Sequence, residues 1–204
     1  MGSEAKCTAT MNGKSASGTA RLETDVLQVR GDGLKMSIPF KAMTSVVARN
    51  GELRVTAPEG MASFDLGLAA QKWADKIRNP PSRLQKIGVK AEWVASVLGV
   101  EDAAFLKELE GAVSKLSVGR ALENSDAIFV GATKTAQLSR LKTLTASLKT
   151  NGALWVIRPK GRPEIPESAV MAAGKAAGLV DVKVVSFSPT HTAEKFVIPI
   201  SKRR

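Results

Sequence analysis

Residues 5–66 alternate between apolar and polar positions in short runs that glycine, asparagine and proline separate. A period of two places every second side chain on the same face, which is typical of half-buried β-strands. Asn50-Gly51 is a favoured two-residue hairpin turn, because both central positions need a positive φ. The pattern predicts strands at 19–23, 26–30, 34–40, 45–49, 52–56 and 61–66.

The period changes after residue 67. Leu68, Trp73 and Ile77 recur at the spacing of one helix face, so an amphipathic helix closes this half of the chain. The helix must end before Pro80-Pro81, because proline cannot continue a helix. Strands followed by such a helix resemble the pleckstrin-homology-like barrel, in which the helix plugs one open end and Trp73 would fill it. The resemblance is one of pattern and covers about 75 residues.

Pleckstrin-homology-like domains are associated with phosphoinositides, peptides and proteins. A phosphoinositide site needs several basic residues on the first hairpin loop. Here that loop, residues 12–18, carries one lysine. The resemblance therefore implies a protein-interaction module or a purely structural one, and a protein partner is expected.

Residues 91–201 follow a different rhythm, in which apolar runs alternate with helical patterns. The runs predict strands at 93–98, 113–116, 127–130, 153–157, 182–187 and 195–200, with helices at 101–109, 135–148 and 168–177. Fully apolar strands are typical of a sheet covered on both faces, and the last two are expected to be antiparallel to each other.

The predicted fold class is α+β and α/β. An antiparallel β barrel or sandwich with a C-terminal helix comes first, and a small three-layer Rossmann-like α/β domain with an antiparallel last strand follows. The segment around Asn79-Pro80-Pro81-Ser82 is polar and without periodicity. The expected domains are residues 5–80 and 91–201, with a linker at 81–90.

The order of elements from Asp126 onward resembles the C-terminal half of class I methyltransferases. Segments 86–90, 152–160, 178–184 and 195–197 also look like a widespread bacterial domain family of unknown function. That second resemblance covers residues 82–200. It implies a fold and a bacterial source, and no activity.

An enzyme that uses S-adenosylmethionine needs particular residues to hold this cofactor. A methyltransferase needs a glycine-rich turn after its first strand and an acidic residue that ends the second. The first turn, 98–102, keeps one glycine, and the second strand ends at Leu116-Ser117 without a carboxylate. Residues 113–126 are too few for a crossover helix and another strand, so the sheet is expected to be shortened. No catalytic residue is assigned, and no cofactor is expected.

Ligands of open α/β sheets bind outside the carboxyl ends of the strands. The candidate ligand-binding residues are therefore Gly99, Gly131, Thr133, Arg158 and Lys160. The alternative is that the glycines only form tight turns and Arg158 is merely exposed. The sequence favours a non-catalytic binding or regulatory protein. A methyltransferase-like enzyme with an atypical S-adenosylmethionine site is the alternative, and an open cavity beside residues 98–102 that an acidic residue faces would favour it.

The single Cys7 and the single His191 exclude the usual structural zinc sites, so no metal site is predicted. His191 is expected on an exposed turn, without a catalytic partner. Cys7 cannot form an internal disulfide, which fits a reducing compartment.

The net charge of +11 raises the question of nucleic acid. The basic residues are spread over both halves, and only 158–162 and 202–204 are locally dense. Tyrosine is absent and the other aromatic residues fall largely at predicted core positions, so weak non-specific binding is the second alternative. No segment has the roughly 18–20 apolar residues that span a bilayer, and residues 1–14 lack a signal-peptide core. A cytoplasmic, non-membrane protein is expected, and edge strands leave homodimerisation open.

Overall fold

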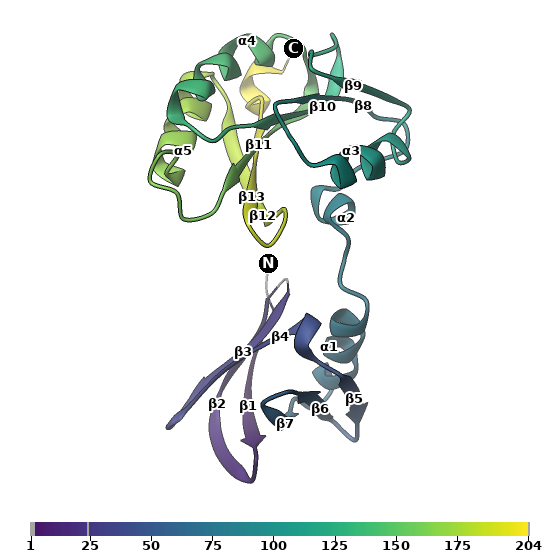
Figure 1. Ribbon diagram of the computed structural model, residues 1–204, viewed down its shortest axis with the longest axis vertical. Coiled ribbons are helices and arrows are strands. Elements are labelled where there is room, and N and C mark those ends of the chain that lie inside the picture. The colour runs from purple at the N-terminus through teal and green to yellow at the C-terminus, as the bar shows by residue number, and fades with distance from the viewer. Residues whose placement is uncertain (1–2, 24, 204) are drawn as a thin grey trace. The chain divides into compact units, whose positions relative to one another are not determined.

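The computed structural model describes residues 3–23 and 25–203, so Arg204 of the basic tail lies outside the described residues. The chain divides into two compact units, Met1–Pro81 and Ser82–Arg204. Figure 1 shows an antiparallel β unit and a separate α/β unit, as the sequence predicts.

The N-terminal unit is one curled, seven-stranded antiparallel sheet with the order β4-β3-β2-β1-β7-β6-β5. Its strands are β1 (Ser3–Met11), β2 (Lys14–Leu22), β3 (Val26–Gly31), β4 (Leu34–Pro39), β5 (Ser45–Arg49), β6 (Glu52–Ala57) and β7 (Gly60–Asp65). A short 3-10 helix, η1 (Phe40–Ala42), follows β4. The edge strands β4 and β5 do not pair with each other, so the curled sheet is a half-barrel and not a closed barrel.

Two-residue turns set the register of two hairpins in this sheet. The predicted turn at Asn50-Gly51 has φ values of 52° and 81°, and Asn12-Gly13 repeats the geometry with 48° and 82°. The seven-residue loop expected at 12–18 is therefore wrong. Because Asn12-Gly13 completes the turn alone, β2 begins at Lys14.

The helix α1 (Ala69–Arg78) closes the N-terminal unit at the predicted place. It buries Trp73, Ala74 and Ile77 in the same core as the inward residues of the strands, such as Leu27 and Phe64. At the end of α1, the Arg78 side chain donates two hydrogen bonds to the backbone carbonyl of residue 46, on the edge strand β5.

The C-terminal unit contains a six-stranded mixed sheet with the order β12-β13-β11-β10-β8-β9. Its strands are β8 (Val94–Leu98), β9 (Lys115–Val118), β10 (Ser125–Gly131), β11 (Leu148–Pro159), β12 (Val180–Ser186) and β13 (His191–Val197). The four neighbouring strands β9, β8, β10 and β11 are parallel, whereas β13 is antiparallel to both of its neighbours. The predicted antiparallel end of the sheet is confirmed.

Helices cover both faces of this sheet and make the predicted third layer. The helices of this unit are α2 (Arg83–Ile87), α3 (Ala103–Glu110), η2 (Thr135–Arg140), α4 (Leu141–Thr145), α5 (Glu167–Ala176) and η3 (Ile200–Lys202), of which η3 buries no residue. Phe129 and Trp155 pack on the face toward α2 and α3. Ile128 and Val156 pack on the opposite face, toward α4 and α5. Among the described residues, no helix is long and apolar enough to cross a bilayer.

The single helix predicted over 135–148 is wrong. The segment is the 3-10 helix η2 followed by the short helix α4, and the chain has re-entered the sheet by Leu148. Leu138, Leu141, Leu144 and Leu148 are nevertheless all buried in one cluster. Apolar residues three or four apart suit both helix types, so the spacing identifies the buried face and not the length of the helix.

The predicted shortening of the sheet is confirmed. The chain leaves β9 at Val118 and enters β10 at Ser125, with residues 119–124 running between two strands that both pair with β8. The buried Ser96 hydroxyl anchors this crossing, because its Oγ accepts a hydrogen bond of 2.9 Å from the Leu122 amide. Ser96 Oγ also lies 2.9 Å from Ser125 Oγ. The short crossing leaves β9 as an edge strand.

Candidate functional site

The C-terminal unit has a crevice where its chain changes direction. After β8 the chain adds β9 on one side, whereas after β10 it adds β11 on the other. In open α/β sheets this switch point, at the carboxyl ends of the strands, is the general position of ligand sites. Here it holds a cavity of about 850 Å³.

The cavity, called the crevice below, has three walls. The β8–α3 turn, the β10–η2 turn and the β12–β13 hairpin turn each contribute one, and the end of β11 adds Ile157. Its lining residues are Gly99, Val100, Glu101, Asp102, Ala103, Gly131, Ala132, Thr133, Gln137, Ile157, Phe187, Ser188, Pro189, Thr190 and His191. Among these described residues two are acidic, and none is lysine or arginine.

Two glycines allow the first two walls to approach each other. A Cβ atom at Gly131 would lie 1.9 Å from the carbonyl oxygen of Gly99, so the strand end needs glycine for space. Gly99 has a φ of 65°, which favours glycine for its backbone conformation. The Arg140 guanidinium packs against this junction and donates a hydrogen bond to the Gly131 carbonyl. Burial lowers the pKa of Arg140.

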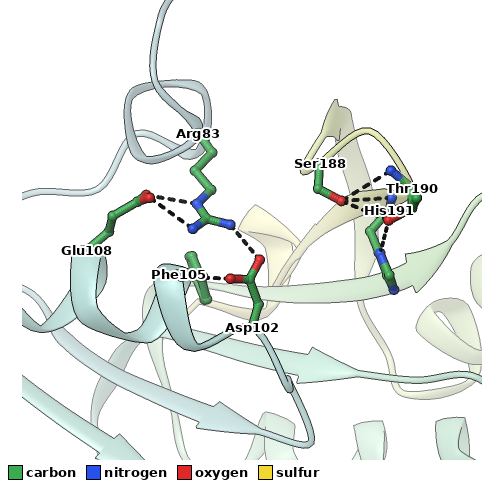
Figure 2. A network of polar contacts seen from close by, with 7 residues as sticks. All are labelled: Arg83, Asp102, Phe105, Glu108, Ser188, Thr190 and His191. Carbon is green, nitrogen blue, oxygen red and sulfur yellow. Dashed lines mark hydrogen bonds and ion pairs between the residues drawn. The ribbon is translucent and has the colours of Figure 1, made fainter.

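Asp102 on the first wall is fixed from two sides, as Figure 2 shows. One carboxylate oxygen caps α3 by accepting the Phe105 amide at 2.8 Å, and the other accepts Arg83 Nη1 at 2.6 Å. Burial opposes ionisation of Asp102, but these hydrogen bonds outweigh burial and hold its pKa below the ordinary value. Asp102 is therefore ionised at neutral pH, and its charge is paired with that of Arg83 at the edge of the crevice.

Arg83 reaches this site from α2. Its guanidinium also donates two hydrogen bonds to Glu108 of α3, and it stacks at 5.2 Å and 5.3 Å from the ring centres of Phe105 and Phe187. The hydrogen bonds that Arg83 donates to Glu108 and Asp102 raise the pKa of Arg83. Arg83 thereby joins α2, the start of α3 and the residue before the hairpin turn.

The hairpin turn of the third wall is held by its own hydroxyl groups (Figure 2). Ser188 Oγ accepts hydrogen bonds from the amides of Thr190 and His191, at 3.3 Å and 3.0 Å. Thr190 Oγ1 lies 2.9 Å from Nδ1 of His191, which orients the imidazole. From outside the turn, Lys160 Nζ donates to Ser186 Oγ and to the Ser188 carbonyl, both at 2.9 Å.

The structure brings together three of the five predicted site residues. Gly99, Gly131 and Thr133 line the crevice. Arg158 and Lys160 instead line a separate hollow near the start of α5, and Arg158 is buried rather than exposed. The crevice is an open cavity beside residues 98–102, and its lining includes the acidic residues Glu101 and Asp102. This is the observation that the methyltransferase-like alternative requires.

Sequence reasoning missed the position of His191. It is half-buried in the crevice wall, not exposed on a turn as expected. The available signal was its position in Ser188-Pro189-Thr190-His191, between two predicted antiparallel strands. Such a hairpin turn lies at one end of the sheet, and the sequence does not say that this is the end with the crevice.

The described residues contain no group of three histidine, cysteine, aspartate or glutamate side chains that could hold a metal ion. Cys7 is half-buried on β1 in the N-terminal unit. Burial raises the pKa of its thiol, which disfavours the reactive thiolate.

The C-terminal unit is a mixed α/β domain with distant structural similarity to the class I S-adenosylmethionine-dependent methyltransferase fold. A methyltransferase from Aquifex aeolicus that depends on S-adenosylmethionine aligns at a TM-score of 0.46 and 18% identity, over 57% of this chain and 87% of its own. A methyltransferase from Pyrococcus furiosus aligns at 0.37 and 12%, over 56% and 78%. The fibrillarin pre-rRNA processing protein of Methanococcus jannaschii aligns at 0.39 and 14%, over 87% and 95%.

No family model matches the chain, and no curated protein matches it. The similarity to solved structures concerns the fold alone.

Proposed function

We propose that the C-terminal unit is a ligand-binding domain and that its crevice is the binding site. One observation carries this proposal. The switch point of the sheet is an open cavity of about 850 Å³, within the size range of small-molecule pockets. A dry crevice filled by side chains would have favoured the purely structural interpretation of Gly99 and Gly131.

The charge of the crevice narrows the class of ligand. Phosphate sites use lysine, arginine or a helix N-terminus to hold negative charge. Here the acidic lining residues are Glu101 and Asp102, and the described lining contains no lysine or arginine. The N-terminus of α3 reaches the crevice, but Asp102 already caps it by accepting the Phe105 amide. A ligand with hydroxyl groups and a positive charge fits this lining better than a nucleotide with phosphates. S-adenosylmethionine has both features, because its sulfonium and amino groups are cationic and its ribose carries two hydroxyls.

One feature of the crevice fits S-adenosylmethionine poorly. The end of β9 has no carboxylate to accept hydrogen bonds from the ribose, so that role falls to Glu101 and Asp102 of the first turn. The exposed Glu101 is the better target for substitution, because Asp102 also caps α3.

Calorimetric titration of the full chain with S-adenosylmethionine is expected to give saturable, micromolar binding, and adenosine triphosphate is expected to give none. Glu101→Gln should weaken binding about fivefold, the effect of one exposed charge pair. Glu110→Gln is the matched control, because Glu110 is exposed at the other end of α3 and does not line the crevice. Equal affinity for the two ligands, or an equal effect of the two variants, would contradict the proposal.

Methyl transfer from the bound ligand is the second candidate function, and the position of His191 favours it. Its imidazole lines the crevice, and the contact with Thr190 orients the ring. An oriented imidazole can accept the proton that an acceptor hydroxyl or amine loses as it takes the methyl group. We expect S-adenosylhomocysteine to form when hydroxyl or amine acceptors are supplied, and His191→Asn to abolish its formation without loss of S-adenosylmethionine binding. Binding without turnover of any acceptor would leave a non-catalytic domain.

For the N-terminal unit we propose a protein-interaction role of the pleckstrin-homology-like kind. The half-barrel closed by α1 supports it. The first hairpin has a two-residue turn with Lys14 as the one adjacent basic side chain, so it offers too few cations for a phosphoinositide headgroup.

A further inference from the structure

A buried ion pair supports one side of the C-terminal sheet. Arg158 at the end of β11 donates a hydrogen bond of 2.8 Å from Nε to Oε1 of Glu194 on β13, and its Nη2 lies 2.8 Å from the same oxygen in an ion pair. The side chain of Arg158 is 8% exposed, and that of Glu194 is completely buried. The pair faces the layer that contains α5. Arg158 is two positions from Val156 on β11, and Glu194 is two positions from Phe196 on β13, so each lies on the same face as that core residue.

This pair leaves hydrogen-bonding capacity unused. Within the described residues Nη1 of Arg158 forms no hydrogen bond, and Oε2 of Glu194 is buried without a partner. Glu194 Oε2 is an acceptor, which an anion cannot satisfy, so the unused donor Nη1 of Arg158 is the group that bears on ligand binding. A guanidinium fixed on one edge by a carboxylate keeps a fixed orientation for a second acceptor on its other edge.

Arg158 lies in the lining of a hollow of about 530 Å³, which we call the basic hollow. Its lining residues are Arg158, Lys160, Gly161, Arg162, Pro163, Pro166, Glu167, Val184 and Thr192. Three of them are basic and one is acidic. The acidic one, Glu167, is largely exposed and lies 3.9 Å from Arg158 Nη2, too far for a hydrogen bond.

The basic side chains of the hollow differ in how far other contacts already occupy them. Lys160 Nζ already holds the hairpin turn through Ser186 and Ser188, so it contributes charge more than contact. Arg162 is exposed, and the described residues give it no ion pair. The first turn of α5 begins at this hollow, and its unpaired amides add partial positive charge.

We propose that the basic hollow binds a small oxyanion, a phosphate or a carboxylate group, between Arg158 and Arg162. The two guanidinium groups supply charge-assisted hydrogen bonds to the ligand oxygens. The buried Glu194 holds Arg158 in place for this contact. The site is separate from the crevice and opposite to it in charge, and the proposal does not rest on ligand binding in the crevice.

The test is a titration of the isotope-labelled full chain with inorganic phosphate, and separately with acetate, at constant ionic strength set by chloride. The amide signals of the residues in 160–168 other than Pro163 and Pro166 are followed by nuclear magnetic resonance. At least one of the two anions is expected to give saturable shifts. Phosphate alone would identify a phosphoryl ligand, and acetate alone would identify a carboxylate. Shifts that rise linearly with both anions would overturn the proposal.

Variants with opposite expected effects sharpen the test, and all leave the buried pair intact. Arg162→Gln should weaken binding about tenfold, the loss of one charge-assisted hydrogen bond. Glu167→Gln should strengthen binding about threefold, because it removes a competing negative charge. Lys115→Gln removes an exposed cation on β9, at the far edge of the sheet, and should change nothing. If Arg162→Gln and Lys115→Gln have equal effects, only general charge attraction is present and the site is refuted.

Discussion

Gly131→Ala is expected to destabilise the protein by about 3 kcal/mol, the upper range for an added methyl group that has no space. The new Cβ would lie 1.9 Å from the Gly99 carbonyl oxygen and 2.6 Å from its carbon. Both are backbone atoms, so no side chain can turn aside to make room. The end of β10 and the β8–α3 turn must separate, and these two segments form two walls of the crevice. Ligand binding in the crevice should therefore be lost together with stability.

Urea denaturation measures the first effect, and calorimetric titration with S-adenosylmethionine measures the second. Gly111→Ala is the matched control. Gly111 has a φ of −74°, and its Cβ would meet nothing closer than the Lys107 carbonyl at 3.8 Å. There alanine should be neutral or stabilise by about 0.4–1 kcal/mol, because it restricts the unfolded chain. Equal stabilities of the two variants would show that the close approach of Gly99 and Gly131 is not a constraint on the fold.

The position of Gly131 was accessible to sequence reasoning because it depends on local pattern. An apolar run at 127–130 marks a buried strand, and the residue after such a strand lies at its carboxyl end. The carboxyl ends of neighbouring parallel strands meet at one edge of the sheet, so Gly99 and Gly131 were expected at one site. The same logic placed Thr133 there.

The same reasoning placed Arg158 wrongly, because a side chain at the end of a strand can point to either face of the sheet. β11 continues through Pro159, and alternation puts Arg158 on the side of Leu154 and Val156, beneath α5. Its partner Glu194 is 36 positions away in sequence. No local pattern relates them, and a charged residue beside an apolar run is normally exposed.

Arg83 and His191 show the same limit. Arg83 was part of a predicted linker, and its role depends on α2 packing near Asp102 and Phe187, which only the folded chain brings together. His191 belongs to a hairpin whose turn reaches the crevice. The sequence thus indicated the sheet and its switch point, whereas contacts between distant segments determined which side chains line the site.

The ion pair that sequence analysis missed is expected to have the other large effect on stability. Arg158→Met should destabilise the protein by about 3–5 kcal/mol at pH 8, the usual result of removing one partner from a buried pair. Glu194 would then be a buried carboxylate with neither oxygen paired to arginine. The double variant Arg158→Met with Glu194→Met replaces both charges by apolar groups and should recover most of the loss.

The pH dependence distinguishes this mechanism from a simple loss of packing. Burial already raises the pKa of Glu194 in the folded protein, against the opposing effect of Arg158. Without Arg158 that pKa rises further. When the folded pKa of a carboxyl lies above its unfolded value, stability is greatest where both states are protonated and falls as the pH rises through the folded pKa. The deficit of Arg158→Met relative to wild type should therefore be small near pH 4 and should widen toward pH 8, as measured by urea denaturation at each pH. A deficit that stays constant over this range would mean that lost packing, and not the uncompensated charge of Glu194, destabilises the variant.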